Sequence, residues 1–378
     1  MGAHGGPNMV EDGMVFGYDT GNSKSYAGEP TTNFADTDAK RSWGTHGGAT
    51  STTEDAPEKG PGWKKLIITD INGSNYRLAQ FPYLTQADGT TRTYSVEYDL
   101  GNLTGYFLFV DGTSGYDQTS VSGRGRYSAT IGPVSGAKNI SIFLGRSGTS
   151  NNINHVIYYR DYQVEEKSHA TQFTAGTRSA TQGLVDFKDS TTLDLSNVSF
   201  DSDAQMTFDG TSDKINLADA AHLKFPGGSF TIEQVLIVDA ISSKQRTFSK
   251  GSSSWSRGWH AAIRPTQWEF ELSDGVSSPG NSFKIDTTTT VGTNHVAWVI
   301  ENGATAKLYI NGVQAGSTQT ITEGIDFATT TSTVGIGAYE LGAEYFNGKI
   351  PYTKLYNKAL TAEEVQNNFN GIRNRFGI

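Results

Sequence analysis

The chain has 378 residues, a formal net charge of −9 and no cysteine. At about 150 residues per domain, this length predicts two or three domains. The lack of cysteine excludes disulfides and thiolate metal sites, and the acidic balance argues against a nucleic-acid partner, whose phosphates require basic surfaces. The first residues lack the basic and apolar regions of a secretory signal. No apolar run approaches the roughly 20 residues of a membrane span, so membrane insertion is not expected.

The composition is typical of a β-rich chain with many tight turns. Glycine is abundant, with 44 residues, and aromatic residues make up 11% of the chain, whereas charged residues reach only 18%. Aromatic and β-branched residues favour strands, and glycine favours turns. The sequence therefore predicts a protein built mainly from strands.

Candidate strands recur about every ten residues in the first half of the chain, a spacing typical of a β-sandwich. Within residues 92–99, Tyr94, Val96 and Tyr98 alternate with polar residues and predict one buried strand face. The apolar residues of 155–165 fall out of simple phase, which predicts a bulge. We expect this first sandwich to span residues 30–178.

A polar stretch at residues 179–203 is expected to be a linker, because the strand pattern restarts after it. We expect a second sandwich over residues 204–378. Asn-Gly between β-branched residues is the strongest short hairpin signal. It occurs twice here, at Asn302-Gly303 and Asn311-Gly312.

The N-terminal arm, residues 1–29, is too short to fold alone. Its Phe16 and Tyr18 are expected to add a strand either to the chain's own sandwich or to that of a neighbouring molecule, since an exposed sheet edge accepts an added strand.

The C-terminal residues predict a short helix. Thr361 and Glu364 have the spacing of a capping box. Val365, Phe369 and Ile372 recur at helical spacing and predict one buried face. We expect this helix to close the second sandwich, with Val365 and Phe369 covering an open end of its core.

Residues 204–378 resemble the laminin-G-like, concanavalin A-like jelly-roll superfamily. The resemblance is carried by "MTFDGTSDKINL", "NHVAWVIENGATAKLYINGVQAG" and "YFNGKIPYTKLYNKALTAEEVQNNFN". The family often has a tryptophan just before the His-Val-Ala strand, whereas this chain has Trp298 later in that strand. The resemblance implies a lectin-like jelly roll.

The first half resembles carbohydrate-binding-module-like jelly rolls, through "GEPTTNF", "GRGRYSATI" and "YYRDYQVEEKSHATQFTAGTRS". The last of these runs, like the end of the chain, is similar to segments of bacteriophage fibre and virion proteins. Together the two resemblances imply an all-β chain with two β-sandwich (jelly-roll) domains in tandem and a short C-terminal helix.

The resemblance also implies a function without catalysis. It predicts a structural component of a phage virion, in a fibre, tail or capsid-decorating position, assembled in the host cytoplasm. Such a protein would contact other virion proteins, adhere to host-surface glycans and form a homo-oligomer. Two alternatives stay open, the accessory portion of a polysaccharide-degrading enzyme and a cement protein without ligand.

A paired-carboxylate motif for glycoside hydrolysis is incomplete. Sandwich glycosidases of the concanavalin A-like type carry Glu-x-Asp-x-x-Glu on one strand face, which places two carboxylates beside the glycosidic bond. In "EYDLGN", Glu97 and Asp99 align with this pattern, but Asn102 stands at the last position. We therefore predict a solvent-facing strand and no catalytic residues.

A calcium ion held between loops is a further possibility, because many sandwiches bind one through carboxylates and carbonyls. Asp209 and Asp213 in "FDGTSDK" are candidate ligands, as are Asp161 in "YYRDYQ" and Asp19 in "FGYDTGN". For Asp209 the alternative is an ordinary turn residue, since Asp-Gly is common in turns.

Sugar binding would use exposed aromatic rings beside hydrogen-bonding side chains. Candidate glycan contacts in the first half are Trp43, Trp63 and Tyr116. In the second half Trp255 lies in the polar loop "GSSSWSRGW" and is the preferred candidate. Trp259 and Trp268 are expected in strands instead, because Trp268, Phe270 and Leu272 alternate as a core face does.

Overall fold

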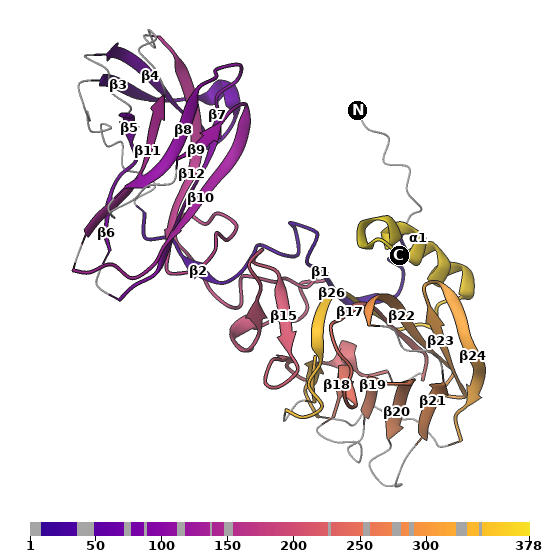
Figure 1. The fold of residues 1–378 in the computed structure, drawn as a ribbon. Coiled ribbons are helices and arrows are strands. Elements are labelled where there is room, and N and C mark those ends of the chain that lie inside the picture. The colour runs from indigo at the N-terminus through magenta and orange to yellow at the C-terminus, as the bar shows by residue number, and fades with distance from the viewer. Residues whose placement is uncertain are drawn as a thin grey trace. The chain divides into compact units, whose positions relative to one another are not determined.

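The computed structural model describes most of the chain: residues 9–35, 49–71, 77–86, 89–111, 118–136, 138–146, 154–225, 228–251, 258–273, 281–286, 291–322, 331–339 and 342–378. The chain divides into two compact units (Figure 1). The C-terminal unit consists of Met1–Glu29, Ala180–Asp201 and Gln205–Ile378. The inserted unit consists of Pro30–Ser179 with Ser202–Ala204.

The larger sheet of the C-terminal unit is antiparallel. Its strands, in spatial order, are β14 (Ser199–Phe200), β15 (Met206–Asp209), β26 (Asn347–Tyr356), β17 (Phe230–Val238), β22 (Gly292–Glu301), β23 (Thr305–Ile310) and β24 (Val313–Thr320). β1 (Met14–Asp19) also pairs with β26, beyond the residues that pair with β15. Both predicted Asn-Gly hairpins are present, and they join β22 to β23 and β23 to β24.

A smaller antiparallel sheet faces the larger one. Its strands, in order, are β16 (Ile215–Leu217), β25 (Val334–Ile336), β18 (Gln245–Lys250), β19 (Gly258–Arg264), β20 (Gln267–Ser273) and β21 (Asn281–Asp286). Two short 3-10 helices, η2 (Leu195–Asn197) and η3 (Ala221–Leu223), lie in the connections.

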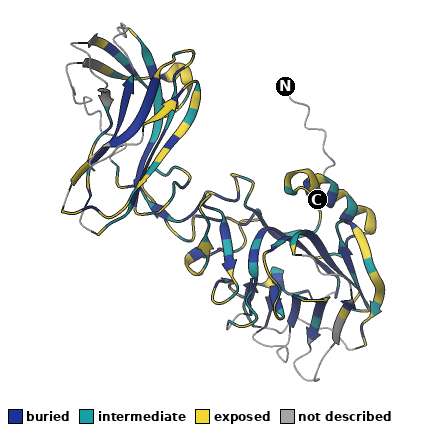
Figure 2. Ribbon diagram, in the orientation of Figure 1, coloured by how far each residue is buried: buried dark blue, intermediate teal, exposed yellow. Residues whose placement is uncertain are grey.

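The core lies between these two sheets, because alternate residues of each strand point inward. Trp298 of the larger sheet stacks on Phe270 of the smaller one, with ring centroids 5.2 Å apart. Trp259 and Trp268 are fully buried in the same core, as their strand pattern predicts. Figure 2 shows this burial along the strands, in contrast to the exposed β24.

Two segments outside the expected second sandwich, residues 204–378, contribute to this core. Phe16 and Tyr18 of β1 are buried in it, so the arm adds its strand to the chain's own sandwich. Leu184, Leu193 and Leu195, from the stretch expected to be a linker, are buried in the same core.

Helix α1 (Ala362–Phe376) begins with the predicted capping box, in which Thr361 and Glu364 bond reciprocally. Gly377 ends the helix in the left-handed conformation, with φ of 71°. Among the described residues, no helix is long and apolar enough to cross a bilayer.

The face that α1 covers differs from the expectation. Val365 packs with Ala297, Val299 and Tyr309 on the outer face of the larger sheet, whereas the core contains their strand neighbours, such as Trp298. The expectation that Val365 and Phe369 cover an open end of the core is therefore wrong. Apolar residues on both faces of β22 require a cover on each side of the sheet, and α1 is the second cover.

The inserted unit is a second sandwich. One sheet contains, in order, β10 (Arg124–Ile131), β7 (Arg92–Asp99), β12 (Val156–Glu165), β4 (Lys64–Ile71) and β3 (Ala49–Asp55). The other contains β5 (Arg77–Gln80), β11 (Lys138–Arg146), β8 (Tyr106–Asp111) and β9 (Thr119–Val121), with β6 (Leu84–Gln86) also paired to β11. β2 (Thr31–Thr32) pairs with β13 (Thr177–Arg178), and η1 (Pro57–Lys59) precedes β4.

The predicted strand face and the predicted bulge are both confirmed in this unit. Tyr94 and Val96 are buried in its core, and Tyr98 packs against it. The pairing of β12 with β7 shifts between Arg160 and Gln163, where Asp161 has a φ of 55°. The prediction of an all-β chain with a C-terminal helix is thus confirmed.

Candidate functional site

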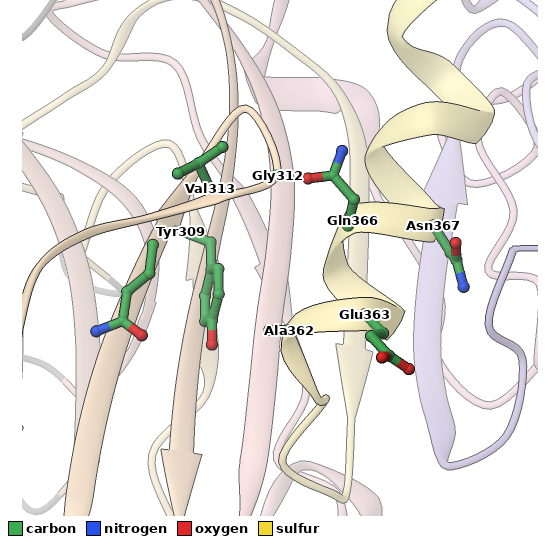
Figure 3. A pocket seen from close by; sticks show the side chains of 8 residues that line it. Tyr309, Gly312, Val313, Ala362, Glu363, Gln366 and Asn367 are labelled. Atoms are coloured by element: carbon green, nitrogen blue, oxygen red, sulfur yellow. The ribbon is translucent and has the colours of Figure 1, made fainter.

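A groove on the C-terminal unit lies between the β23–β24 turn and the first half of α1. Its volume is about 510 Å³. Figure 3 shows Tyr309 and Val313 on the hairpin side and Gln366, Glu363 and Asn367 on the helix side. The described residues that line it are Tyr309, Gly312, Val313, Gln314, Ala362, Glu363, Gln366 and Asn367.

The hairpin wall of the groove depends on the Asn311-Gly312 turn. Both residues have positive φ, 50° and 79°, as a tight hairpin turn requires. A Cβ atom on Gly312 would lie 2.9 Å from the side-chain amide of Gln366 and 2.9 Å from the ring of Phe369. Only glycine therefore lets the turn approach the helix this closely.

The helix wall is held by a buried polar network centred on Glu233 of β17. The carboxylate of Glu233 accepts hydrogen bonds from Asn368 Nδ2 at 2.9 Å and from Tyr356 Oη at 3.1 Å, and His295 Nε2 lies 2.8 Å away. The backbone N–H of Val10 donates to Asn368 Oδ1 at 2.7 Å. The network joins the helix, the three strands β17, β22 and β26, and the N-terminal segment, so the helix wall is fixed before any ligand arrives.

The groove presents several side-chain amides beside an almost wholly buried aromatic ring. The ring of Tyr309 forms part of its wall and is only 4% exposed. Gln314, Gln366 and Asn367 each carry an amide that can both donate and accept hydrogen bonds. Among the described residues of the lining, Glu363 is the one with a charged side chain. Because the ring is almost wholly buried, the amides are the groups that a ligand would meet, and they suit a ligand rich in hydroxyls.

The structure reveals a second carboxylate pair, Glu269 and Glu271 on β20. Lys244 Nζ lies 3.2 Å from Glu269 and 2.6 Å from Glu271. Arg264 pairs with Glu269 at 2.5 Å, and Arg246 with Glu271 at 2.5 Å. Burial opposes ionisation, but the hydrogen bond from Arg264 and the charge of Lys244 outweigh it and lower the pKa of Glu269 to about 2. A general acid needs a raised pKa, so this pair forms a structural ion network.

The carboxylate pair singled out in the sequence is also occupied by cations. Glu97 pairs with Arg124 and Arg160, each at 2.6 Å, and Asp99 pairs with Lys59 at 2.8 Å. Burial alone would raise the pKa of Glu97, but hydrogen bonds from Arg160 and Arg124 lower it. The hydrogen bond from Lys59 lowers the pKa of Asp99. Neither carboxyl group is poised to donate a proton.

Three of the four predicted aromatic contacts, Trp43, Tyr116 and Trp255, lie outside the described residues. The fourth, Trp63, is 4% exposed. The guanidinium carbons of Arg124 and Arg160 lie over its ring, 5.0 and 4.8 Å from the centroid. In this arrangement Trp63 supports two arginines and presents no open ring face.

The predicted calcium ligands Asp209 and Asp213 organise a turn after β15. Asp209 Oδ1 accepts backbone N–H groups from Thr211, Ser212 and Asp213, at 2.8, 2.7 and 3.0 Å. Burial opposes it, but these bonds and the hydroxyl of Thr211 hold the pKa of Asp209 well below its usual range. Asp213 Oδ2 accepts the N–H groups of Ser199 and Asp209, each at 3.1 Å.

The other two predicted ligands are not brought to this turn. Asp19 accepts a hydrogen bond from Arg375 at 2.7 Å, and Asp161, in the inserted unit, lies 3.5 Å from Arg160. Within the described ranges, no three His, Asp or Glu side chains are grouped so that they could hold a metal ion. Calcium binding therefore stays a prediction.

Sequence reasoning missed the groove and the Glu269–Glu271 pair. The groove forms between a hairpin turn and a helix that lie about 50 residues apart in sequence. The Asn311-Gly312 pair predicts the turn, but it does not predict that the helix lies beside it. The second pair was visible as Glu-x-Glu in "WEFEL", which puts two carboxylates on one strand face.

Residues 209–366, under half of the chain, match the family model of the Concanavalin A-like lectin/glucanases superfamily. The matched segment includes nearly the whole lining of the groove. The C-terminal unit has a lectin-like jelly-roll fold. No curated protein matches the chain in sequence.

Solved structures with lectin-like or binding domains are remote neighbours. The carbohydrate-binding module CBM40 of Ruminococcus gnavus IT-sialidase, bound to α2,3-sialyllactose, is 20% identical, with a TM-score of 0.33 over 37% of this chain and 81% of the module. The binding domain of botulinum neurotoxin serotype D is 16% identical, with a TM-score of 0.41 over 51% of this chain and only 49% of that one. Domain 4 of AbnA, a GH43 arabinanase from Geobacillus stearothermophilus in complex with arabinotriose, is 17% identical, with a TM-score of 0.34 over 47% of this chain and 80% of the domain.

Proposed function

We propose that the chain is a non-catalytic glycan-binding protein and that the groove between the β23–β24 turn and α1 binds a neutral saccharide. The observation that carries this proposal is the grouping of the amides of Gln314, Gln366 and Asn367 in one groove, beside the almost wholly buried ring of Tyr309. Gln314 and Gln366 lie within the segment that matches a lectin superfamily.

The size and rigidity of the groove support binding. Its volume of about 510 Å³ falls within the range typical of ligand pockets. The glycine turn fixes one wall, and the Glu233 network fixes the other. A site that is formed in advance loses less conformational entropy when a flexible saccharide binds.

The charge of the groove selects the kind of sugar. Glu363 is charged, and the part of the lining that the structure describes contains no lysine or arginine. An acidic sugar would meet this carboxylate without a compensating cation. Amides instead satisfy the hydroxyls of a neutral sugar as donors and as acceptors.

The environment of the carboxylate pairs supports binding without cleavage. Glu97, Asp99, Glu269 and Glu271 each form an ion pair with lysine or arginine. Retaining and inverting glycosidases both need one protonated carboxyl group at neutral pH, and these cations favour the charged form. An accessory role in a polysaccharide-degrading enzyme would use the same binding groove.

The biological setting forms a separate part of the proposal and rests on sequence resemblance alone. In that setting the chain serves in a phage fibre, tail or capsid decoration, is assembled in the host cytoplasm and contacts other virion proteins. A homo-oligomer would present several grooves at once, so weak single contacts would add up to firm adhesion.

The test begins with a glycan array and then measures affinities by calorimetry. We expect a neutral oligosaccharide to bind, and Gln366→Ala to weaken its binding about tenfold, as the loss of one or two hydrogen bonds predicts. Gln319→Ala is the matched control, because this amide lies on β24 outside the groove.

Two outcomes would overturn the proposal. One is an array on which no neutral glycan binds, which would favour a cement protein without ligand. The other is an equal loss of affinity in Gln366→Ala and Gln319→Ala. Shortening of a bound polysaccharide on incubation with the protein would show that the enzyme alternative holds.

A further inference from the structure

A second surface of different chemistry lies on the inserted unit, on the outer face of the β10–β7–β12 sheet. In the strand register, Arg126 of β10 and Arg160 of β12 both pair with Glu97 of β7. Arg124 is two residues before Arg126 and pairs with Asp99. Arg124 and Arg160 meet at the carboxylate of Glu97, whereas Arg126 donates to Ser95 Oγ at 2.9 Å and to the carbonyl oxygen of Thr171 at 3.0 Å.

Two of these arginines are held in place from two directions. Glu97 Oε1 accepts hydrogen bonds from Arg124 Nε at 2.9 Å and Nη2 at 2.6 Å, and Glu97 Oε2 accepts one from Arg160 Nε at 2.6 Å. The same two guanidinium groups lie over the ring of Trp63. Cation–π contacts and charge-assisted hydrogen bonds together fix the planes of both groups.

Donors are left over after these contacts. Arg124 Nη1 and both terminal nitrogens of Arg160 have no acceptor among the described residues. The Arg124 side chain is 56% exposed and that of Arg160 is 29% exposed, so solvent reaches them. The oriented N–H groups of these arginines are available to a ligand.

We propose that this surface, which we name the arginine face (Trp63, Glu97, Arg124, Arg126 and Arg160), binds the carboxylate of an acidic saccharide. A guanidinium group matches a carboxylate in shape, because two parallel N–H groups can meet two oxygens. Trp63 and Glu97 act as positioning residues that keep the arginines in the binding orientation. This site is independent of the groove proposed above, since it lies in the other unit and selects the opposite charge class.

The overall charge favours a ligand whose carboxylates are sparse. The chain has a net charge of −9, which repels dense polyanions such as nucleic acid. Beyond about 8–10 Å this repulsion is screened at physiological salt, whereas the direct contact of one carboxylate with one guanidinium persists. A glycan with a carboxylate on some of its sugar units meets this condition better than an acidic peptide does.

The experiment compares carboxylate-bearing glycans with neutral glycans of the same length, on an array and then by calorimetry with the full chain. We expect an acidic member to bind and its neutral counterpart to lose that affinity. Arg160→Gln and Arg124→Gln should each weaken binding about tenfold or more, as for the loss of a hydrogen bond to a charged group. Arg160→Lys keeps the positive charge but loses the two parallel N–H groups. Its affinity for the acidic glycan should lie between those of Arg160→Gln and the unchanged protein.

Lys138→Gln is the matched control, because it removes one exposed positive charge from the other sheet of the inserted unit. Circular dichroism and thermal unfolding of each variant confirm that the unit is folded. The proposal would be overturned if acidic and neutral glycans bound with equal affinity, or if no acidic glycan bound. It would also be overturned if Lys138→Gln lost as much affinity as the arginine variants. Tighter binding of poly-glutamate than of any acidic glycan would overturn the assignment to a saccharide.

Gln366→Ala should leave the affinity for acidic glycans unchanged if the two sites are separate. The proposal for the groove and the proposal for the arginine face can therefore be disproved independently.

Discussion

The groove of the C-terminal unit and the arginine face of the inserted unit show two ways in which the outer face of a β-sheet is used. In the C-terminal unit, apolar residues on the outer face are covered by α1, and the groove forms where the cover meets a hairpin turn. In the inserted unit, ionic side chains form the outer surface of the sheet and need no helix. The cover creates a walled site lined mainly by amides, whereas the open face creates a site lined by arginines.

The largest loss of stability is expected when the Glu233 network that anchors α1 is broken. Glu233→Ala leaves Asn368, Tyr356 and His295 without their buried acceptor. We expect the free energy of unfolding of the C-terminal unit to fall by about 3 kcal/mol, because each unsatisfied buried group costs about 1–3 kcal/mol. Hydrogen exchange should show lost protection in α1 and unchanged protection in β7 and β12. Unchanged protection in α1 would mean that the network does not anchor the helix.

A smaller effect is expected at the hairpin wall, where two Asn-Gly turns allow a matched comparison. Gly303→Ala meets only the strain of a positive φ of 61°, because its nearest neighbour would lie at 3.8 Å. This strain costs about 1–2 kcal/mol. Gly312→Ala adds contacts of 2.9 Å with Gln366 and Phe369. We expect urea unfolding to show a greater loss for Gly312→Ala, and only this variant to lose binding of a neutral glycan. Equal losses in both variants would show that the turn and the helix are not in close contact.

The fold was far more predictable from the sequence than the sites were. Local patterns were sufficient for the Asn-Gly hairpins, the bulge near Asp161 and the capping box at Thr361, since each depends on neighbouring residues. The choice between the chain's own sheet and a neighbour's for β1 depends on pairing with β26, more than 300 residues away.

The position of α1 illustrates the same limit. A buried stripe containing Val365 shows that the helix packs against something, but it does not say which surface. The partner residues Ala297 and Val299 look like ordinary strand residues in the sequence. The arginine face is also not predictable from the sequence, because no local pattern places Arg124 and Arg160 over the ring of Trp63.

Acidification should weaken the arginine face through the protonation of Glu97. The folded pKa of Glu97 lies below its ordinary value of 4.5. A depressed pKa means that the stability contributed by Glu97 is fully present above about pH 4.5 and is lost as the pH falls through the lower folded pKa. We expect thermal unfolding of the inserted unit to shift to lower temperature in this range, and Glu97→Gln to reduce the shift. A shift of the same size in Glu97→Gln would mean that other groups control the acid response.

The smallest effect concerns salt. Binding at the arginine face should weaken as the concentration of sodium chloride rises from 0.1 M to 1 M, since the screening length falls from about 10 Å to about 3 Å. Binding of a neutral glycan in the groove should change little over the same range. Calorimetry with one acidic and one neutral glycan tests both statements, and a parallel salt dependence would remove the distinction between the two sites.

The central claim is that the groove binds a neutral glycan without cleaving it, and the most direct measurement follows side-chain amides by nuclear magnetic resonance. When a neutral oligosaccharide selected on an array is added, we expect the amide signals of Gln314, Gln366 and Asn367 to shift while those of Gln319 stay in place. The saccharide should be recovered at full length. Shifts confined to residues outside the groove, or recovery of shortened saccharide, would contradict the account.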